Sequence, residues 1–177
     1  NIAVDDKVFK PNLTSQLSFE AAVSKVQNNF KVLDLGCGSG IIGIAIMKNF
    51  LHIEMHCSDL DDKSVKITKH NFLKYKLQAD IRNGNLFDPW GEKKFDYIIN
   101  DVSGISSVIA INSPWFGSNV PCDSGEDGSN LTSAILKNAP TYLNKEGSIQ
   151  IPLISLSNTK KIVEVAEENF SEIKIIK

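Results

Sequence analysis

The most informative segment of this chain reads Val32-Leu33-Asp34-Leu35-Gly36-Cys37-Gly38-Ser39-Gly40-Ile41-Ile42-Gly43. An apolar run reaches the carboxylate of Asp34, a glycine-rich turn follows, and an apolar segment that can form a helix begins at Ile41. Glycine allows backbone angles closed to other residues, and a helix start offers free N–H groups at a positive dipole end. Ligands of open α/β sheets bind at the carboxyl ends of the strands, where Asp34 is expected. The segment therefore predicts a strand, a ligand-binding loop and a helix.

Strands and helices alternate on both sides of this segment. We expect strands at residues 31–35, 53–58, 79–82, 95–100, 148–154 and 171–177. We expect helices at residues 15–28, 41–49, 62–75, 131–143 and 158–169, with Thr14 or Ser15 as the cap of the first. Residues 104–111 fit a short helix or a strand, and residues 112–130 form a long loop.

This alternation predicts the α/β fold class, with a mostly parallel sheet and helices on both faces. We expect one Rossmann-like, three-layer domain over residues 1–177, in which residues 1–30 form a loop and helix that lead into the core.

The composition is that of an ordinary globular domain. Of the 177 residues, 42% are hydrophobic and 23% are charged, and the formal net charge is −2. The sequence has no apolar run of about 18 residues, so no membrane span is expected, and the charge does not demand a nucleic-acid partner. The three cysteines are far apart and form no C-x-x-C pair. This pattern argues against a metal site and fits a reducing, cytoplasmic location.

The glycine loop admits two ligand classes. Gly38, Gly40 and Gly43 match the dinucleotide pattern G-x-G-x-x-G, which favours an NAD-type oxidoreductase domain. However, Ile41 stands where Gly or Ala is expected if Gly36 starts the pattern, and Asp34 would repel a pyrophosphate. A carboxylate directly before the loop instead suits a ligand that carries a cationic amino-acid group.

Four landmarks, in the expected order, resemble the class I S-adenosylmethionine-dependent methyltransferases. Asp34 to Gly40 is similar to the family's cofactor loop, and Asp59, in Ser58-Asp59-Leu60, matches the acid that accepts bonds from both ribose hydroxyls. Gly84-Asn85-Leu86-Phe87 stands where the family often has Gly-Asp-Leu-Phe, and the Asn85 carbonyl can accept the adenine amino group. The fourth landmark is the strand that leads to Asp101. The resemblance implies S-adenosyl-L-methionine as cofactor, bound by Asp34, Gly36, Cys37, Gly38, Gly40, Asp59, Leu60, Asn85, Leu86 and Asp101.

The chain departs from the family where the methyl acceptor is bound. N-methyltransferases of this type continue with Asn, Asp or Ser, then Pro-Pro and an aromatic residue, whereas this chain has Asp101-Val102-Ser103-Gly104. The resemblance implies that Asp101 grips the acceptor or acts as base, with Asn100 and Ser103 as weaker candidates. We expect residues 112–130 to close as a lid, with Trp115 or Phe116 in place of the lost aromatic residue.

Two further segments are similar to the group that methylates protein glutamine or nucleic-acid bases. They are Ser124-Gly125-Glu126-Asp127-Gly128 and Phe9-Lys10-Pro11 with the helix that follows. The resemblance implies methyl transfer to a nitrogen atom, with oxygen as second choice, and a protein or small-molecule acceptor ahead of nucleic acid. An NAD-type oxidoreductase domain and a non-catalytic cofactor-binding protein stay open as alternatives. The family's final antiparallel strand is expected to lie beyond Lys177, where this chain ends.

Overall fold

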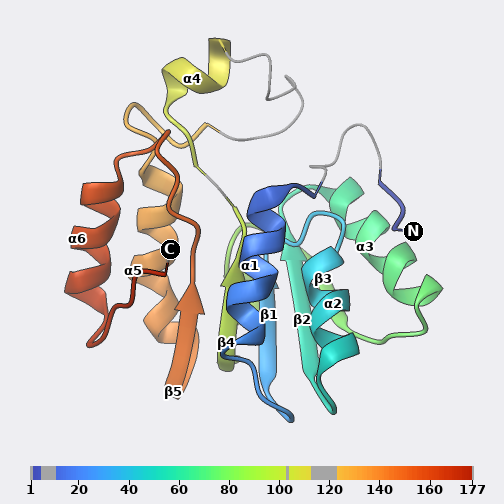
Figure 1. The fold of residues 1–177 in the computed structure, drawn as a ribbon. Coiled ribbons are helices and arrows are strands. Elements are labelled where there is room, and N and C mark those ends of the chain that lie inside the picture. Colours follow the sequence, from blue (N-terminus) through green and yellow to red (C-terminus); the bar gives the residue numbers. More distant parts are fainter. Residues whose placement is uncertain (1, 5–10, 103, 113–122, 177) are drawn as a thin grey trace. The chain divides into compact units, whose positions relative to one another are not determined.

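The computed structural model describes residues 2–4, 11–102, 104–112 and 123–176, shown as a ribbon in Figure 1. These residues group into two compact units. Unit 1 comprises Asn1–Asp101 and Tyr142–Ile151, and unit 2 comprises Val102–Thr141 and Pro152–Lys177. The predicted lid residues Trp115 and Phe116 lie outside the described residues, as does Ser103.

Unit 1 is built on a five-stranded sheet with the order β3-β2-β1-β4-β5. Every pair of neighbouring strands is parallel. The strands are β1 (Lys31–Leu35), β2 (Glu54–Asp59), β3 (Asp80–Asn83), β4 (Phe95–Asn100) and β5 (Leu143–Gln150). The strand order reverses between β1 and β4, and ligands of such sheets bind outside the carboxyl ends of the strands at this switch point.

The described residues of unit 1 also form three helices and a short 3-10 turn. They are α1 (Leu13–Val23), α2 (Ile41–Asn49), α3 (Asp62–Lys74) and η1 (Asp88–Trp90). The cap of α1 is Asn12, whose side chain accepts hydrogen bonds from the N–H groups of Thr14 and Ser15. The prediction that Thr14 or Ser15 caps this helix is therefore wrong, because the helix begins at Leu13, two residues before its predicted start.

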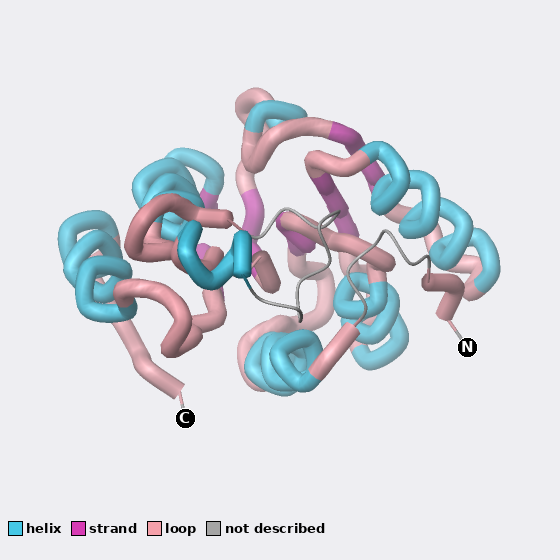
Figure 2. The backbone as a smooth tube through the Cα atoms, turned by 90° about the horizontal axis from the view of Figure 1, so that it is seen from above, coloured by secondary structure: helices cyan, strands magenta, loops and turns pink. Residues whose placement is uncertain are grey.

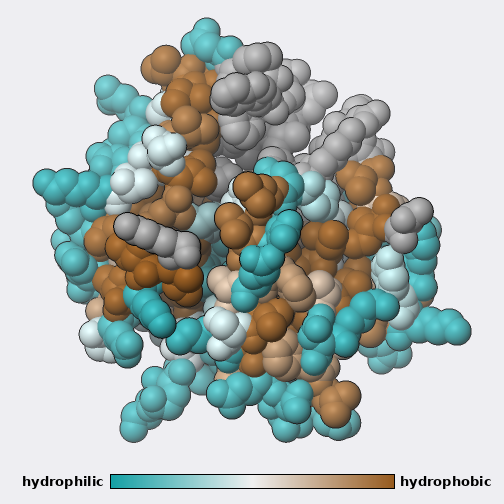
Figure 3. All heavy atoms as spheres, in the orientation of Figure 1, coloured by the Kyte–Doolittle hydropathy of each residue, from teal (hydrophilic) through white to brown (hydrophobic). Residues whose placement is uncertain are grey.

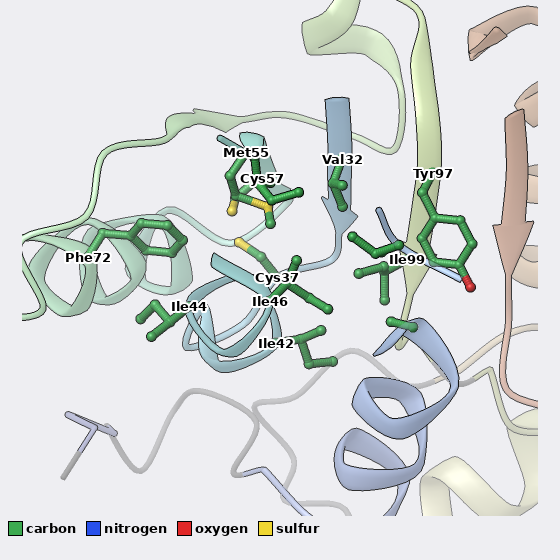
Figure 4. Close-up of a cluster of buried hydrophobic side chains, with 13 residues drawn as sticks. Val32, Cys37, Ile42, Ile44, Ile46, Met55, Cys57, Phe72, Tyr97 and Ile99 are labelled. Carbon is green, nitrogen blue, oxygen red and sulfur yellow. The ribbon is translucent and has the colours of Figure 1, made fainter. Parts of the chain in front are cut away.

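The core of unit 1 lies between these helices and one face of the sheet. Val32 of β1, Met55 of β2 and Ile99 of β4 meet α2 side chains there, as Figure 4 shows. Ala22 of α1 and Phe72 of α3 join the same cluster. The opposite face of the sheet presents the buried ring of His56, which lies edge-on to Trp90 and Phe95 at centroid distances of 5.2 Å.

Unit 2 holds the remaining helices, α4 (Ser107–Asn112), α5 (Asn130–Tyr142, whose last residue belongs to unit 1) and α6 (Thr159–Asn169). Its turns are tied together by Asp127, whose carboxylate accepts hydrogen bonds from Ser129, Asn158 and Lys161. The sequence of residues 104–111 fits a short helix or a strand, and the structure has a helix at residues 107–112, which Figure 2 shows with the other helices.

The predicted fold class is confirmed, because a parallel sheet is flanked by helices. Two strand predictions are wrong. The fifth strand covers Leu143–Gln150 rather than residues 148–154, and residues 171–176, expected as a sixth strand, form none. The β-branched run after Ser171 resembles a strand, but Ile173, Ile175 and Ile176 are exposed.

Hydrophobic side chains also reach the surface of α1, where Leu13 and Leu17 are exposed. Figure 3 shows hydrophobic and hydrophilic side chains intermingled on the side that carries this helix. Among the helices in the described ranges, none is both long and apolar enough to span a membrane.

Candidate active site

The glycine loop lies between β1 and α2 and is fastened to β2. Its three glycines have left-handed backbone angles, with φ of 76° at Gly36, 54° at Gly38 and 76° at Gly40. The N–H groups of Gly36 and Cys37 donate to the carbonyl of Ser58 over 2.8 and 3.0 Å. Only glycine adopts such angles routinely, so the spacing of the three glycines fixes the path of the loop.

Close packing against α3 explains the third glycine. A Cβ atom on Gly40 would lie 2.8 Å from Cγ2 of Thr68, whereas a Cβ atom on Gly38 would meet nothing within 4 Å. Thr68 also donates to the carbonyl of Gly38 over 2.9 Å. Gly40 is therefore required by the fold, while Gly38 leaves open space beside the loop.

Cys37 contributes to this loop through its backbone. Its side chain is buried in the core of unit 1 and points towards Cys57 and Met55 (Figure 4). Its thiol lies 3.5 Å from the hydroxyl of Thr68. If Cys37 contacts a ligand, as the sequence predicts, the main chain must make that contact.

Asp34 is a buried carboxylate with one unused oxygen. Its Oδ2 accepts a hydrogen bond from the N–H of Gly43 over 3.1 Å, and its Oδ1 has no partner among the described residues. Burial raises the pKa of Asp34 to about 7, and the negative charges of Asp101 and Asp59 add to this shift. An unpartnered buried acceptor calls for an explanation, and a cationic group bound beside the loop would supply its partner.

Asp59 closes the loop from the end of β2. Its Oδ2 accepts the N–H of Gly38 over 2.9 Å, and its Oδ1 accepts the N–H of Asp61 over 2.9 Å. Burial raises the pKa of this carboxyl group. Each carboxylate oxygen has a second lone pair, so Asp59 can still accept two hydroxyl donors. Leu60, beside it, is 62% exposed and offers an apolar surface.

Asn85 and Leu86 lie in the turn after β3, next to the end of β2. The N–H of Gly84 donates to the carbonyl of Asp59 over 3.0 Å, which joins the two strand ends. Asn85 is exposed, and Leu86 has a φ of 44°, an uncommon angle for a branched side chain. The structure thus brings Asn85 and Leu86 to the same edge of the sheet as Asp59.

Asp101 follows β4 and is held by two hydroxyl groups of α1. Ser15 Oγ donates to its Oδ2 and Ser18 Oγ to its Oδ1, both over 2.7 Å. Burial raises the pKa of Asp101, and the two serine bonds oppose this shift. Asn100, the neighbouring candidate, is fully buried at the end of β4.

The sequence analysis did not identify Ser15 and Ser18 as partners of a site residue. Both serines lie on the buried side of α1 together with Ala22. Their spacing of three residues along a largely apolar stripe was the available signal, because residues three apart share a helix face. Ser15 had been interpreted as a helix cap instead.

These residues fit the predicted cofactor. Carboxylates lie at the carboxyl ends of β1, β2 and β4, which are neighbours in the sheet, so all three lie at one edge. Asp34 offers an acceptor to an ammonium group, Asp59 offers acceptors to paired hydroxyls, and Gly38 leaves room beside the backbone. The arrangement suits a ligand that combines a nucleoside with an amino acid.

Comparison with known proteins shows similarity to methyltransferases. The family model of the methyltransferase small domain matches residues 14–101. The release factor glutamine methyltransferase of Geobacter sulfurreducens is 24% identical over 161 residues, which cover 86% of this chain and 55% of that protein. The corresponding protein of Clostridium botulinum is 30% identical over 159 residues, which cover 84% and 56% of the two chains. This chain thus spans about half the length of these two relatives.

Solved structures share the fold. The 16S rRNA N2 G1207 methyltransferase of Thermus thermophilus, solved with AdoMet and guanosine, has a TM-score of 0.66 and 21% identity. That match covers 91% of this chain and 39% of the other. A methyltransferase from Pyrococcus furiosus has a TM-score of 0.65 and 16% identity, with 95% and 75% covered.

The family match spans α1 to Asp101, which are the elements that form the glycine loop and the carboxylates around it. The predicted resemblance is therefore confirmed, and the chain belongs to the class I S-adenosylmethionine-dependent methyltransferases, within the methyltransferase small domain family.

Proposed function

We propose that this protein transfers a methyl group from S-adenosyl-L-methionine to a nitrogen atom of a protein or nucleic acid. The observation that carries this proposal is the set of carboxylates at one edge of the sheet, Asp34 and Asp59 beside the glycine loop and Asp101 after β4. The first two suit the cofactor, and the third suits the acceptor.

The cofactor half of the site is formed by backbone and acidic groups. We assign the amino-acid end of the cofactor to Asp34, whose Oδ1 is unpartnered, and to the backbone of the loop at Gly36, Cys37, Gly38 and Gly40. Asp59 accepts the two ribose hydroxyls, and Leu60, Asn85 and Leu86 border the adenine. When bound, the cofactor supplies an activated methyl group on sulfur for an in-line displacement.

The acceptor half depends on Asp101. A carboxylate is an acceptor-only group, so it selects an acceptor that donates N–H and orients the nitrogen that carries it. It can also take the proton that the nitrogen loses after methylation. Positioning of this kind can supply much of a rate enhancement. Asn100 and Ser103 remain the second candidates for this role.

A planar amino or amide group is the acceptor that this chemistry favours. The two relatives described above are named for glutamine, and a further one, of Francisella tularensis, is named a ribosomal protein uL3 glutamine methyltransferase. A glutamine amide and an exocyclic base amine both present an NH2 group. We favour the glutamine of a protein because the net charge of −2 gives no basic footprint for nucleic acid.

We also propose that residues 1–177 act as one methyltransferase domain. The sheet of unit 1 takes β4 from before residues 102–141 and β5 from after them. The first segment of unit 2, Val102–Thr141, is therefore inserted in the sequence between two paired strands of unit 1.

The test combines binding and transfer. Calorimetry with S-adenosylhomocysteine and with NADH separates a methyltransferase from an NAD-type protein, and we expect only the first ligand to bind. Transfer of radiolabelled methyl groups is then measured on purified release factor, ribosomal protein uL3 and 16S rRNA, and we expect label on a protein. Binding of NADH alone would favour the oxidoreductase alternative, and binding of S-adenosylhomocysteine without transfer to any of the three would favour a non-catalytic protein.

A further inference from the structure

We infer that Ser15 and Ser18 of α1 are positioning residues that fix the carboxylate of Asp101 for the methyl acceptor. This inference rests on the proposed function, since it concerns the acceptor side of the same site. It assigns a role to α1 beyond covering the sheet.

The two serine side chains bind different oxygens of the Asp101 carboxylate. Ser15 serves one oxygen of Asp101 and Ser18 serves the other, each over 2.7 Å, and both serines are only 7% exposed. Two donors on opposite oxygens prevent rotation of the carboxylate about its Cβ–Cγ bond. Each oxygen keeps one lone pair, so the fixed group still presents acceptors to a bound N–H group.

The position of α1 does not depend on Asp101 alone. The side chain of Gln150, in β5, donates through Nε2 to the carbonyl of Ser18 over 2.7 Å. Its Oε1 accepts the hydroxyl of Tyr97, in β4, over 2.8 Å. The backbone of Ser18 is thus bonded to the sheet and its side chain to Asp101. Because the sheet fixes the position of the helix independently of Asp101, the helix can fix the orientation of the carboxylate.

The hydroxyl groups also act on the charge of Asp101, because their hydrogen bonds lower its pKa against the larger, opposite effect of burial. Buried carboxyl groups tend to hold their proton, and donors to the charged form oppose this tendency. The two serine hydroxyls of α1 donate to Asp101, and Asp34 of β1 lies close enough for the two carboxylates to interact. Asp34 is a like charge, so the serines are the groups that favour the acceptor form at neutral pH.

The experiment removes the hydroxyls one at a time and together, as Ser15→Ala, Ser18→Ala and the double variant. Ser24→Ala, an exposed serine at the end of the same helix, is the matched control. The pKa of Asp101 is followed through its carboxyl 13C signal, S-adenosylhomocysteine affinity by calorimetry, and turnover by methyl transfer to release factor. Ser15→Thr keeps a hydroxyl and serves as the conservative variant.

We expect the pKa of Asp101 to rise in each alanine variant and most in the double variant. Turnover should fall about 10- to 100-fold, with its acidic limb moved to higher pH, while affinity for S-adenosylhomocysteine changes less than about twofold. Ser15→Thr should recover most of the turnover that Ser15→Ala loses, and Ser24→Ala should behave like the wild type. If the double variant does not fold, the single variants carry the comparison.

Two results would overturn the proposals separately. An unchanged Asp101 titration in the alanine variants, together with wild-type turnover, would leave the serines as packing residues of α1. A wild-type protein that neither binds S-adenosylhomocysteine nor transfers methyl groups would instead contradict the proposed function itself.

Discussion

The backbone N–H of Gly38 donates a hydrogen bond to Oδ2 of Asp59 over 2.9 Å, which joins the loop after β1 to the end of β2. The other oxygen of Asp59 accepts the N–H of Asp61 at the start of α3. One carboxylate therefore orders the backbone on both sides of the site. The carboxylate that we propose for the ribose hydroxyls therefore also shapes the glycine loop, which we propose for the amino-acid end of the cofactor.

Asp59→Ala should weaken binding of S-adenosylhomocysteine by at least tenfold. Hydrogen bonds to charged groups contribute about 1.5–3 kcal/mol each, and this substitution removes the loop anchor as well as the proposed ribose contact. Calorimetry at pH 7.5 gives the dissociation constant. Asp62→Ala is the matched control, because that carboxylate is exposed and pairs with Lys66 on the surface of α3. Equal affinity in the two variants would remove Asp59 from the cofactor site.

Gly38→Ala and Gly40→Ala should separate binding from folding. Both positions have left-handed angles, which cost about 1–2 kcal/mol with a side chain. Only at Gly40 does the new Cβ also press on Thr68 and Phe72. We expect Gly40→Ala to lower the free energy of unfolding by more than about 2 kcal/mol. Gly38→Ala should fold and lose affinity for S-adenosylhomocysteine more than tenfold, since its methyl group enters the space beside the loop. Urea unfolding and calorimetry measure the two effects, and a Gly38→Ala variant with wild-type affinity would move the cofactor away from this loop.

The sequence predicted the elements that local chemistry specifies. The continuous apolar run before Asp34 and the glycines after it fixed β1, the loop and the start of α2, and the structure agrees at residue level. The two wrong strand predictions fall where the local hydrophobic pattern of the sequence differs from the pairing of strands in the fold. β5 begins at Leu143, directly after α5, because pairing with β4 decides where a strand begins. Residues 171–176 have strand-like composition but no partner strand among the described residues.

Only those features of the site that depend on one local segment of the sequence could be predicted. Asp34, Asp59 and Asp101 each lie at or near the end of a segment that the sequence predicts as a strand, so each could be placed at a strand end. The contacts of Ser15 and Ser18 with Asp101 span more than 80 residues, and the spacing of the two serines indicates a shared helix face but not the partner that they bind. The exact use of Cys37 was also hidden, because the direction of its side chain depends on the left-handed glycines on either side.

Asp101→Ala should retain cofactor affinity and lose turnover. The variant removes the acceptor that we assign to the methylated nitrogen, and groups of this kind contribute about 10²–10⁴-fold to rates. Asp101→Asn is the informative companion, because its carbonyl can still accept an N–H but cannot take a proton. Methyl transfer to release factor at saturating cofactor compares the three proteins. Substantial turnover in Asp101→Asn but not in Asp101→Ala would assign Asp101 to orientation, whereas full turnover in both would move the acceptor site elsewhere.

As pH rises, Asp34 should lower the free energy of unfolding but raise the affinity for the cofactor. Its pKa is about 7 in the folded protein against a usual value of 3.8, so between these values the folded state holds a proton that the unfolded state lacks. The free energy of unfolding therefore falls as pH rises from about 4 to 7, by up to about 4 kcal/mol from this group. Asp34→Asn should remove that contribution, so that its stability relative to the wild type increases between pH 5 and 8 in urea unfolding without ligand.

The substitution Asp34→Asn should also weaken binding of the cofactor, because binding uses the charged form of Asp34. For the wild type, affinity for S-adenosylhomocysteine should rise with pH through about 7, since a bound ammonium group stabilises the carboxylate. Asp34→Asn should bind more weakly at pH 8 and lose most of this pH dependence, while Asp62→Asn, at an exposed position, should follow the wild type in both measurements. An Asp34→Asn variant that binds as tightly as the wild type at pH 8 would show that the amino-acid end of the cofactor is held by the loop backbone without this carboxylate. In that case the buried, unpartnered Oδ1 would need another explanation, because its presence then lowers stability at neutral pH with no gain in binding.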